Sequence, residues 1–491
     1  MAPMPWRVTQ NNLLKITENY RSENLHNKRN ITTISIHLLN ICGTFVFIYT
    51  QISFSVASTI TVGPQGNYTK VSEAILASSP GDEILIESGE YLDDTVTLSH
   101  GDITIRGIGP SRPVLRTLEN IPNRKGIFAI PVGAGPVVVE GLHFEGARIS
   151  DTDGGNAAGI RMQGTSLVVR DCVFTDNQMG ILAGGTDGFS VDIRNSEFSH
   201  NGRDGSGYEH NVYIGTDQCS EFIFMGNYSH HAATGHQVKS RCQRNIIAYN
   251  RLMDEWTGNS SYIIDLPEGG RSLIYGNLIE QGPMTENSSA IISYGAEGTN
   301  DDMTAIIVHN TIVNDKDTSA TAFIRMNRGE TVYLRNNLFI GLGTPILAED
   351  SNTVIDEQGS LQVESQFTNE IVVNRANFNY HIPSASPAEN TGVELGILAE
   401  ESIEVLEQYE HPVQIVPRWD DNAPDIGAYG IGNPPTDNTD TAVSDTADTT
   451  DTDEPTENTL PQKDRGCFQG NSIFSLWPLW IAVVCVRKRK L

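Results

Sequence analysis

The side chains best suited to chemistry lie between residues 239 and 271, where basic and acidic residues occur close together. The five candidate catalytic residues in this stretch are Lys239, Arg241, Asp265, Glu268 and Arg271. Elimination from a uronic acid needs a base for the proton next to the carboxylate, and a cation that holds the carboxylate as its charge grows. Lys239 is the candidate base, and Arg241 or Arg271 is the candidate cation. These residues predict a lyase that acts on a uronic-acid-containing polysaccharide.

Other side chains nearby could hold a sugar polymer through hydrogen bonds and ring stacking. The candidates for substrate binding are Asn211, Tyr213, Gln237, Tyr262, Tyr294 and Arg325. Two acidic pairs, Asp265 with Glu268 and Asp254 with Glu255, offer an alternative as the paired carboxylates of a glycoside hydrolase. A Lys–Asp pair on an exposed sheet can also be a surface ion pair worth under about 1 kcal/mol. A non-catalytic carbohydrate-binding or adhesion protein therefore stays open as the second interpretation.

Histidines at positions 210, 230, 231 and 236 are concentrated in the same part of the chain. His210 and His236 occupy equivalent positions of consecutive repeats and share the strand parity of the apolar residues Val212 and Val238. We therefore expect these two histidines to be buried ladder or edge residues rather than metal ligands, and the sequence offers no firm site for a cofactor.

A repeat must position these candidates, because an apolar run followed by Asn, one residue and another apolar residue recurs along the chain. The apolar residues that close the copies are 24 to 33 residues apart, and they are Phe174, Phe198, Tyr228, Leu252, Ile279, Ile312 and Phe339. Short β-rich runs fill each copy, Asn, Gly and Asp separate them, and no helical pattern intervenes. Repeats of this length stack into solenoids. We predict an all-β fold, a right-handed parallel β-helix, in which the Asn at each turn bonds to the Asn above and below.

Strand alternation then places the candidates on one wall of the predicted solenoid. If the apolar residues at positions 212, 238, 264, 292 and 324 point inward, the next residue of each strand points outward. The predicted outward row is Tyr213, Lys239, Asp265, Ser293 and Arg325. The spacing of Cys219 and Cys242 is close to the local repeat, so they should lie on adjacent coils. They are either a disulfide or two buried ladder residues.

The chain is strongly acidic, with 33 Lys and Arg against 61 Asp and Glu and a net charge of −28. Nucleic acid is not an expected partner, because phosphate binding needs a basic surface. An acidic polysaccharide would need a local basic patch or a bridging cation. We expect the protein to be a monomer.

Composition divides the rest of the chain into segments. Residues 1–57 are predicted to be a secretory signal peptide with a long n-region, and an uncleaved membrane anchor is the alternative. The β-helix is predicted over residues 58–348. In the less regular residues 349–433, the runs Phe378 to Pro383 and Pro424 to Tyr429 resemble the closing segment of surface-anchored bacterial β-helix proteins. The resemblance implies further coils and a C-terminal cap. Residues 434–466 form an acidic Asp/Thr-rich linker that cannot bury enough apolar surface to fold. Residues 467–491 hold an apolar run that is short for a full membrane span, followed by a basic end.

Two of these segments resemble known protein families. Residues 59–110 carry the pattern VG-x-x-G-x-Y-x-x-V-x-x-A-I followed by PGDEI-x-I-x-x-G-x-Y. This pattern resembles the start of pectate-lyase-like β-helix proteins, which implies that Val71 to Ala77 is an N-terminal capping helix. The order of acidic linker, Gly466-Cys467, apolar run and basic end resembles the Myxococcus-type sorting signal of bacterial surface proteins. That implies secretion and attachment to the bacterial cell surface or outer membrane through the tail.

The surroundings of Lys239 are similar to the chondroitinase B and alginate lyase group, in which Lys is followed by Ser and an Asn-bearing turn, as in Val238-Lys239-Ser240 here. The resemblance implies that Lys239 is the base. The acidic residues with which that group binds calcium have no counterpart in residues 232–237, which read AATGHQ, and the Arg expected one coil later is missing near Asp265. The sequence therefore shows no matching acidic site for Ca²⁺.

Overall fold

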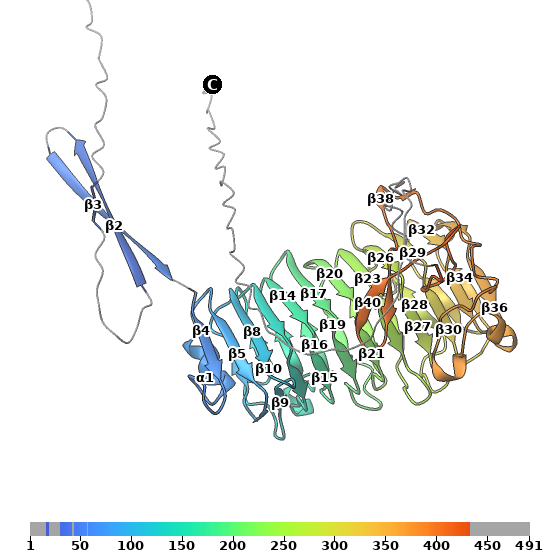
Figure 1. Cartoon of the computed structure of the whole chain (residues 1–491), viewed down its shortest axis with the longest axis horizontal. Helices are drawn as coiled ribbons and strands as arrows, with labels where there is room; N and C mark the ends of the chain where they lie inside the picture. The colour runs from blue at the N-terminus through green and yellow to red at the C-terminus, as the bar shows by residue number, and fades with distance from the viewer. Residues whose placement is uncertain (1–15, 19–29, 42–43, 56, 433–491) are drawn as a thin grey trace, which may run out of the picture. The chain divides into compact units, whose positions relative to one another are not determined.

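The computed structural model describes residues 16–18, 30–41, 44–55 and 57–432. Residues 57–432 contain three long parallel sheets that run side by side along one solenoid (Figure 1). Each coil crosses the three sheets in turn, so a strand pairs in parallel with the strand one coil away. The fold is a right-handed parallel β-helix, which confirms the predicted fold class.

The three sheets form the three walls of the solenoid. Sheet 1 consists of β4 (Thr59–Val62), β5 (Glu83–Glu87), β8 (Ile103–Ile108), β11 (Val137–Glu140), β14 (Ser166–Arg170), β17 (Phe189–Arg194), β20 (Cys219–Met225), β23 (Arg244–Ala248), β26 (Arg271–Tyr275), β29 (Thr304–Val308), β32 (Thr331–Arg335) and β35 (Val354–Gln358). Sheet 2 consists of β6 (Glu90–Leu92), β9 (Val114–Arg116), β12 (His143–Glu145), β15 (Val173–Thr175), β18 (Glu197–Ser199), β21 (Tyr228–His230), β24 (Arg251–Met253), β27 (Leu278–Gln281), β30 (Thr311–Asn314), β33 (Leu338–Ile340) and β36 (Leu361–Val363). Sheet 3 consists of β7 (Val96–Thr97), β10 (Gly126–Ile130), β13 (Ala158–Met162), β16 (Met179–Ala183), β19 (Val212–Ile214), β22 (Val238–Ser240), β25 (Ile264–Leu266), β28 (Ala290–Tyr294), β31 (Ala322–Met326) and β34 (Thr344–Ala348).

Helix α1 (Val71–Ala77) follows the first strand, β4, and lies at the position predicted for the N-terminal capping helix. Its buried residues Val71, Ala74 and Ile75 belong to the same core as the first strands. The carboxylate of Asp94 accepts hydrogen bonds from the backbone N–H groups of Val71 and Ser72, so a neighbouring loop satisfies the free donors at the start of the helix.

Outside the solenoid, β1 (Ile16–Glu18), β2 (Asn30–Ile41) and β3 (Thr44–Ser55) form a three-stranded antiparallel sheet. The predicted signal peptide covers these strands together with residues outside the described ones, and it stays a prediction. The predicted linker and tail, residues 434–491, lie outside the described residues. In the described part of the chain, no helix has the length and apolar character to cross a membrane.

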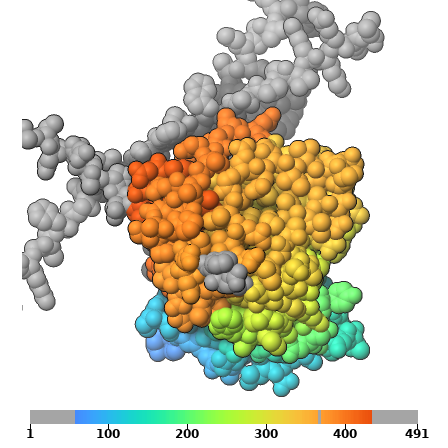
Figure 2. All heavy atoms as spheres, turned by 90° about the vertical axis from the view of Figure 1, so that its right-hand side faces the viewer, coloured from blue at the N-terminus to red at the C-terminus, as the bar shows by residue number. Residues whose placement is uncertain are grey.

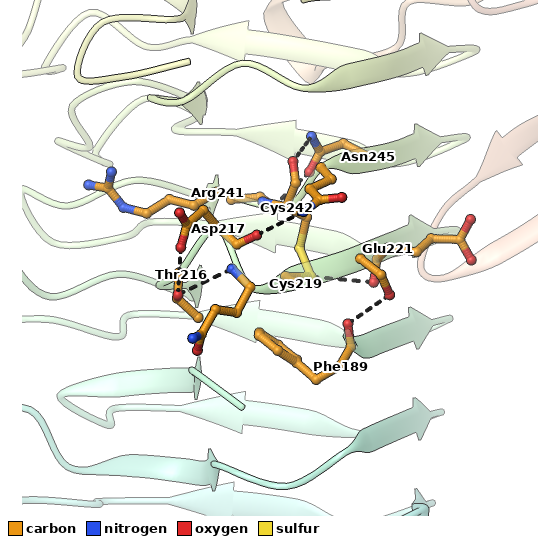
Figure 3. Close-up of a disulfide and its surroundings, with 12 residues drawn as sticks. Phe189, Thr216, Asp217, Cys219, Glu221, Arg241, Cys242 and Asn245 are labelled. Carbon is orange, nitrogen blue, oxygen red and sulfur yellow. Dashed lines mark hydrogen bonds between the residues drawn. A yellow bond between two sulfur atoms is a disulfide. The ribbon is translucent and has the colours of Figure 1, made fainter. Parts of the chain in front are cut away.

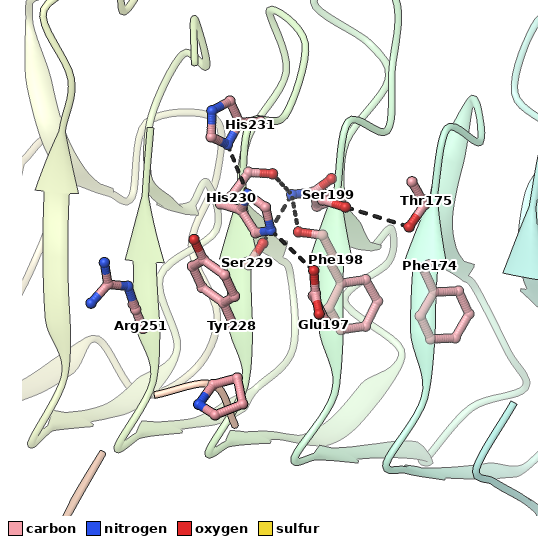
Figure 4. Close-up of polar contacts among 12 residues, drawn as sticks. Phe174, Thr175, Glu197, Phe198, Ser199, Tyr228, Ser229, His230, His231 and Arg251 are labelled. Atoms are coloured by element: carbon pink, nitrogen blue, oxygen red, sulfur yellow. Dashed lines mark hydrogen bonds and ion pairs between the residues drawn. The ribbon is translucent and has the colours of Figure 1, made fainter. Parts of the chain in front are cut away.

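The interior of the solenoid is filled by ladders of equivalent side chains from successive coils. Phe144, Phe174 and Phe198 stack with ring centroids 5.0 and 4.7 Å apart, and Figure 4 shows two of these rings side by side. At the turn from sheet 1 to sheet 2, a column of buried asparagines runs up the coils, consisting of Asn227, Asn250, Asn277, Asn310 and Asn337. Each of the first four donates from Nδ2 to Oδ1 of the next, at 2.9 to 3.2 Å. This confirms the predicted asparagine ladder.

One position of the predicted repeat is shifted by a residue. Phe198 pairs with Ser229, not with Tyr228. Tyr228 instead lies on the outer side of sheet 2, where it packs in an apolar cluster with the C-terminal segment. A bulky aromatic side chain suggests an inward position, but a later part of the chain covers this outer face and removes the cost of an exposed ring.

Cys219 and Cys242 lie on adjacent coils and form a disulfide, with their Cα atoms 4.5 Å apart (Figure 3). The sequence left two interpretations open, and the structure contains the bridge. Arg241 immediately precedes Cys242, and its guanidinium points away from the bridge (Figure 3).

The regular coils continue past Ala348, because β34, β35 and β36 complete one more coil. The chain then forms two 3-10 turns and two short hairpins, which are η2 (Ser365–Glu370), η3 (Arg375–Asn377), β37 (Ile397–Leu398), β38 (Glu401–Ser402), β39 (Glu407–Glu410) and β40 (Gln414–Pro417); a further 3-10 turn, η1 (Asp151–Asp153), lies earlier in the chain.

This C-terminal segment, residues 365–432, lies along the side walls of the solenoid, beside the last coils in the end-on view of Figure 2. Its residues Tyr380, Ile426 and Tyr429 pack on the outer face of sheet 2. Leu398 and Ile403 pack on the outer face of sheet 1. The segment predicted to be a cap therefore covers the outer faces of two sheets.

Candidate functional site

The candidate site lies on the outer face of sheet 3. The two apolar clusters of the C-terminal segment cover sheets 1 and 2 and do not include this wall. Five consecutive strands, β19, β22, β25, β28 and β31, pair so that the predicted outward residues stand one above another. The row is Tyr213, Lys239, Asp265, Ser293 and Arg325. The alternation of residues in short strands therefore placed this row correctly.

Lys239 is at the centre of a compact ion-pair network. Its Nζ is 2.9 Å from Oδ2 of Asp265 and 3.2 Å from Oε1 of Glu297, and it lies 5.5 Å from the centre of the Tyr213 ring. Burial opposes the charge of the amine, but the adjacent carboxylates of Asp265 and Glu297 outweigh it and raise the pKa of Lys239 above its usual value. Although Lys239 faces outward, only 8% of its surface is exposed. Glu297 is one of the residues that contact its amine.

Arg241 is the second cation of the network. Its Nη1 is 2.6 Å from Oε1 of Glu268, its Nη2 bonds Oε2 of Glu297, and its Nε donates to the hydroxyl of Tyr213 at 3.0 Å. Burial disfavours the charge of Arg241, but these hydrogen bonds outweigh it and raise the pKa of the guanidinium. Glu297, which the sequence analysis did not identify, therefore bridges Lys239 and Arg241 with its two oxygens.

A stack of three rings borders the network. His210 and His236 stack at 4.7 Å, and Tyr262 stacks on His236 at 5.3 Å. The backbone N–H of Tyr262 donates to Nδ1 of His236, so the ring proton is on Nε2, 3.4 Å from Oδ2 of Asp265. Burial lowers the pKa of His236 to about 4. The two histidines are buried ladder residues as expected, but they lie beside the outer row instead of among the inward apolar residues.

Two of the predicted substrate-binding residues are in the interior. Asn211 and Gln237 are fully buried and belong to a second polar ladder, at the turn from sheet 2 to sheet 3. Asn211 Nδ2 donates to Gln237 Oε1 at 2.7 Å, and Gln237 Nε2 donates to Asp254 Oδ1 at 3.0 Å. These strands begin only at residues 212 and 238, so outward alternation does not extend back to Asn211 and Gln237. The structure therefore does not present either side chain to a ligand on the outer face.

The alternative hydrolase pair of Asp254 and Glu255 is split between two environments. Asp254 is buried at the end of the second polar ladder, and this burial raises its pKa to about 6. Glu255 accepts a hydrogen bond from the hydroxyl of Tyr228 near sheet 2. Of the other pair, Asp265 bonds Lys239 and Glu268 bonds Arg241, so each carboxylate is already paired with a cation.

Two more candidates lie away from the network. Arg271 begins β26 in sheet 1, where it bonds Asp302 and Glu401. The chain has turned from sheet 3 to sheet 1 between Asp265 and Arg271, so closeness in sequence does not bring them to one wall. Tyr294 shares the inward parity of Ile292, is 1% exposed, and donates its hydroxyl to the carbonyl of Gly270 at 2.8 Å.

Three polar atoms along the outward row have no hydrogen-bond partner among the described residues. They are Nη1 of Arg161, Oγ of Ser293 and Nε of Arg325. Arg161 occupies the same row two strands before Tyr213, and Arg325 also bonds Glu349 through Nη2 at 2.7 Å. Buried polar atoms are normally paired, so these three mark positions where a polar ligand could bind. The repeat spacing could have identified Arg161.

A second cluster of histidines lies at sheet 2. His230 Nδ1 is 2.7 Å from His231 Nδ1, and His230 Nε2 is 3.4 Å from Glu197 Oε1 (Figure 4). Within the described residues, no group of three or more His, Cys, Asp or Glu side chains is arranged to hold a metal ion.

The fold and this site define a parallel β-helix protein with a charged row on one outer wall. A probable pectin lyase F-2 of Aspergillus terreus is 28% identical over 176 residues, which are 34% of this chain and 35% of that protein. The match thus spans about a third of that relative's length. The crystal structure of pectate lyase Pel9A has the same fold, with a TM-score of 0.52 and 16% identity over 77% of this chain and 97% of that one. No family model matches the chain.

Proposed function

We propose that this protein acts on polysaccharide as a lyase for uronic-acid-containing glycans, with its active site at Lys239 and Arg241. The observation that carries the proposal is the closeness of two cations, Lys239 and Arg241, on one outer wall. Polar atoms of Arg161, Ser293 and Arg325 along the same row have no hydrogen-bond partner among the described residues. The likeness to a probable pectin lyase and to a pectate lyase supports the same class of substrate.

The proposal gives each of these residues a role in the elimination. Arg241 holds the carboxylate of the sugar, which takes up charge as the neighbouring carbon loses its proton. The neutral amine of Lys239 takes that proton, the bond to the glycosidic oxygen breaks, and a double bond forms in the sugar ring. The leaving oxygen takes a proton from the hydroxyl of Tyr213, which lies in the same row as Lys239 and accepts a hydrogen bond from Nε of Arg241.

The test is the ultraviolet absorbance of the unsaturated product during incubation with pectate, alginate and glycosaminoglycans. Wild type should generate product from at least one polymer, and Lys239→Ala should lower the rate by roughly 10²- to 10⁴-fold, the usual contribution of general acid–base catalysis. Product formed equally fast by the variant would remove Lys239 from its role. No product from any polymer would reject the lyase.

A non-catalytic glycan-binding protein is the second candidate, and the complete pairing of Lys239 with two carboxylates favours it. An amine held as a cation by Asp265 and Glu297 can bind an acidic sugar without reacting. Retention of the protein on an immobilised polyuronide, without unsaturated product, would identify this function.

We also infer that the protein works outside the cytoplasm. The disulfide between Cys219 and Cys242 supports this inference, because such bonds persist in oxidising compartments. Fractionation of the producing cells, with sequencing of the mature N-terminus, tests both export and removal of the predicted signal peptide. Attachment through the tail would place the protein in the surface fraction.

A further inference from the structure

We propose that the carboxylate of Glu297 is an internal stand-in for the substrate carboxylate, and that a uronate displaces it from Lys239 and Arg241 when the glycan binds. This inference rests on the proposed function, because it names the group that the same site recognises. It assigns Glu297 a role in specificity, and it identifies the space between the two cations as the uronate subsite.

Glu297 lies between the two cations and contacts both. One oxygen of Glu297 is 3.2 Å from Lys239 Nζ, and the other bonds Arg241 Nη2, so one carboxylate engages both cations. The carboxylate of a hexuronate has the same chemistry and size. The other carboxylates of the network are arranged differently, because Asp265 pairs with Lys239 and Glu268 pairs with Arg241.

Glu297 is also more exposed than the residues it contacts. The side chain of Glu297 is 50% exposed, whereas those of Lys239, Arg241 and Asp265 are 10%, 15% and 4% exposed. Glu297 is therefore the member of this group that solvent reaches most easily. Its departure would open Lys239 and Arg241 to a ligand while Asp265 remained in place.

The side chain of Glu297 can leave the two cations without unfolding the loop that carries it. The backbone N–H groups of Glu297 and Gly298 both donate to the carbonyl of Pro267, at 2.7 and 3.0 Å, and that of Asn300 donates to the carbonyl of Glu268 at 2.8 Å. These bonds fix the loop to the preceding coil. The exchange therefore needs a rotation of one half-exposed side chain, and the incoming carboxylate replaces the ion pairs that Glu297 gives up.

The experiment compares wild type with Glu297→Gln in binding polygalacturonate and alginate, with neutral galactan as the uncharged probe. Binding is measured at mildly acidic pH, where Lys239 is protonated and elimination is slow. Glutamine keeps the size of the side chain and removes its charge, so the competing carboxylate is lost. We expect the affinity of the full-length variant for a polyuronide to rise by roughly tenfold, because the binding-competent state no longer has to displace an ion pair. Affinity for galactan should not change.

Glu268→Gln is the matched control, since it removes the same charge and also faces Arg241, but it does not bridge the two cations. A gain confined to Glu297→Gln supports the stand-in. An equal gain in affinity in both variants would show that only net charge matters and would overturn the inference. Unchanged or weaker binding by Glu297→Gln would also overturn it, as would a failure of wild type and variant to bind either polyuronide. The proposed lyase is judged separately by product formation, so tighter binding without product would reject catalysis and keep the uronate subsite.

Discussion

At the scale of single residues, the proton on Lys239 controls the proposed reaction. The Asp265 and Glu297 carboxylates outweigh burial and raise the pKa of this amine above its ordinary value of 10.5. The base is the neutral amine. At any pH below the pKa, the neutral fraction of Lys239 grows about tenfold with each unit of increase in pH. We expect the rate of product formation to rise steeply from about pH 7 to about pH 9. Initial rates on the preferred polymer, measured across this range, check the prediction; a flat or falling profile would contradict it.

Arg241 and Arg271 were equivalent candidates in the sequence, and the structure separates them. Arg271→Ala should leave the KM for the glycan unchanged and lower the free energy of unfolding by about 1–3 kcal/mol, because Asp302 and Glu401 lose a charged hydrogen-bond donor. Arg241→Ala should raise the KM. Steady-state kinetics and thermal unfolding of both variants provide the comparison. A raised KM in Arg271→Ala would place that residue back in the site.

The row of Tyr213, Lys239 and Asp265 could be predicted from the sequence because strand parity and repeat spacing are local properties. Glu297 could not, since it lies in the loop after β28, and the path of a loop across the wall depends on tertiary hydrogen bonds. The prediction of Tyr294 as a substrate-binding residue could have been avoided, because Tyr294 has the same strand parity as the inward-facing Ile292. At Asn211 the parity rule was applied before its strand begins.

At the scale of elements, the asparagine ladder holds the turns between sheets 1 and 2 in register. Asn277 Nδ2 donates to the carbonyl of Ile247 at 2.8 Å and to Asn310 Oδ1 at 2.9 Å, while its Oδ1 accepts from the backbone and side chain of Asn250. The same buried position recurs on five coils, so each asparagine of this column stabilises the fold and is not a surface residue.

We expect Asn277→Ala to lower the free energy of unfolding by roughly 2–5 kcal/mol, because several buried polar groups lose their partner at about 1–3 kcal/mol each. The exposed Asn352 lies in a loop, and Asn352→Ala is the matched control, with little expected change. Denaturant unfolding of both variants measures the difference. Equal stability of the two variants would mean that the ladder contributes nothing beyond the β-pairing.

At the scale of the whole molecule, the three walls of the solenoid are used differently. The C-terminal segment covers apolar outer residues of sheets 1 and 2, such as Met253, Leu278 and Ile306. Sheet 3 presents the charged row. The chain carries a net charge of −28 and still gathers Lys239, Arg241 and Arg325 on one wall. Each of these cations is paired with carboxylates, so an acidic polymer would be attracted there as it displaces one of them.

Removal of the C-terminal segment tests this division of the walls. A chain that ends at residue 364 would expose nine outward apolar side chains, which are Tyr228, Met253, Leu273, Leu278, Ile306, Val308, Val313, Leu338 and Ile340. Full burial of one such side chain contributes about 1.5–3 kcal/mol. The free energy of unfolding lost by exposing all nine is therefore comparable with the whole stability of a typical domain. We expect this shortened chain to melt at a lower temperature, bind a hydrophobic dye and aggregate. A chain that ends at residue 432 keeps the segment and should melt like the full-length protein. Equal melting of both shortened chains would show that the coils of the solenoid are stable without a covering on sheets 1 and 2.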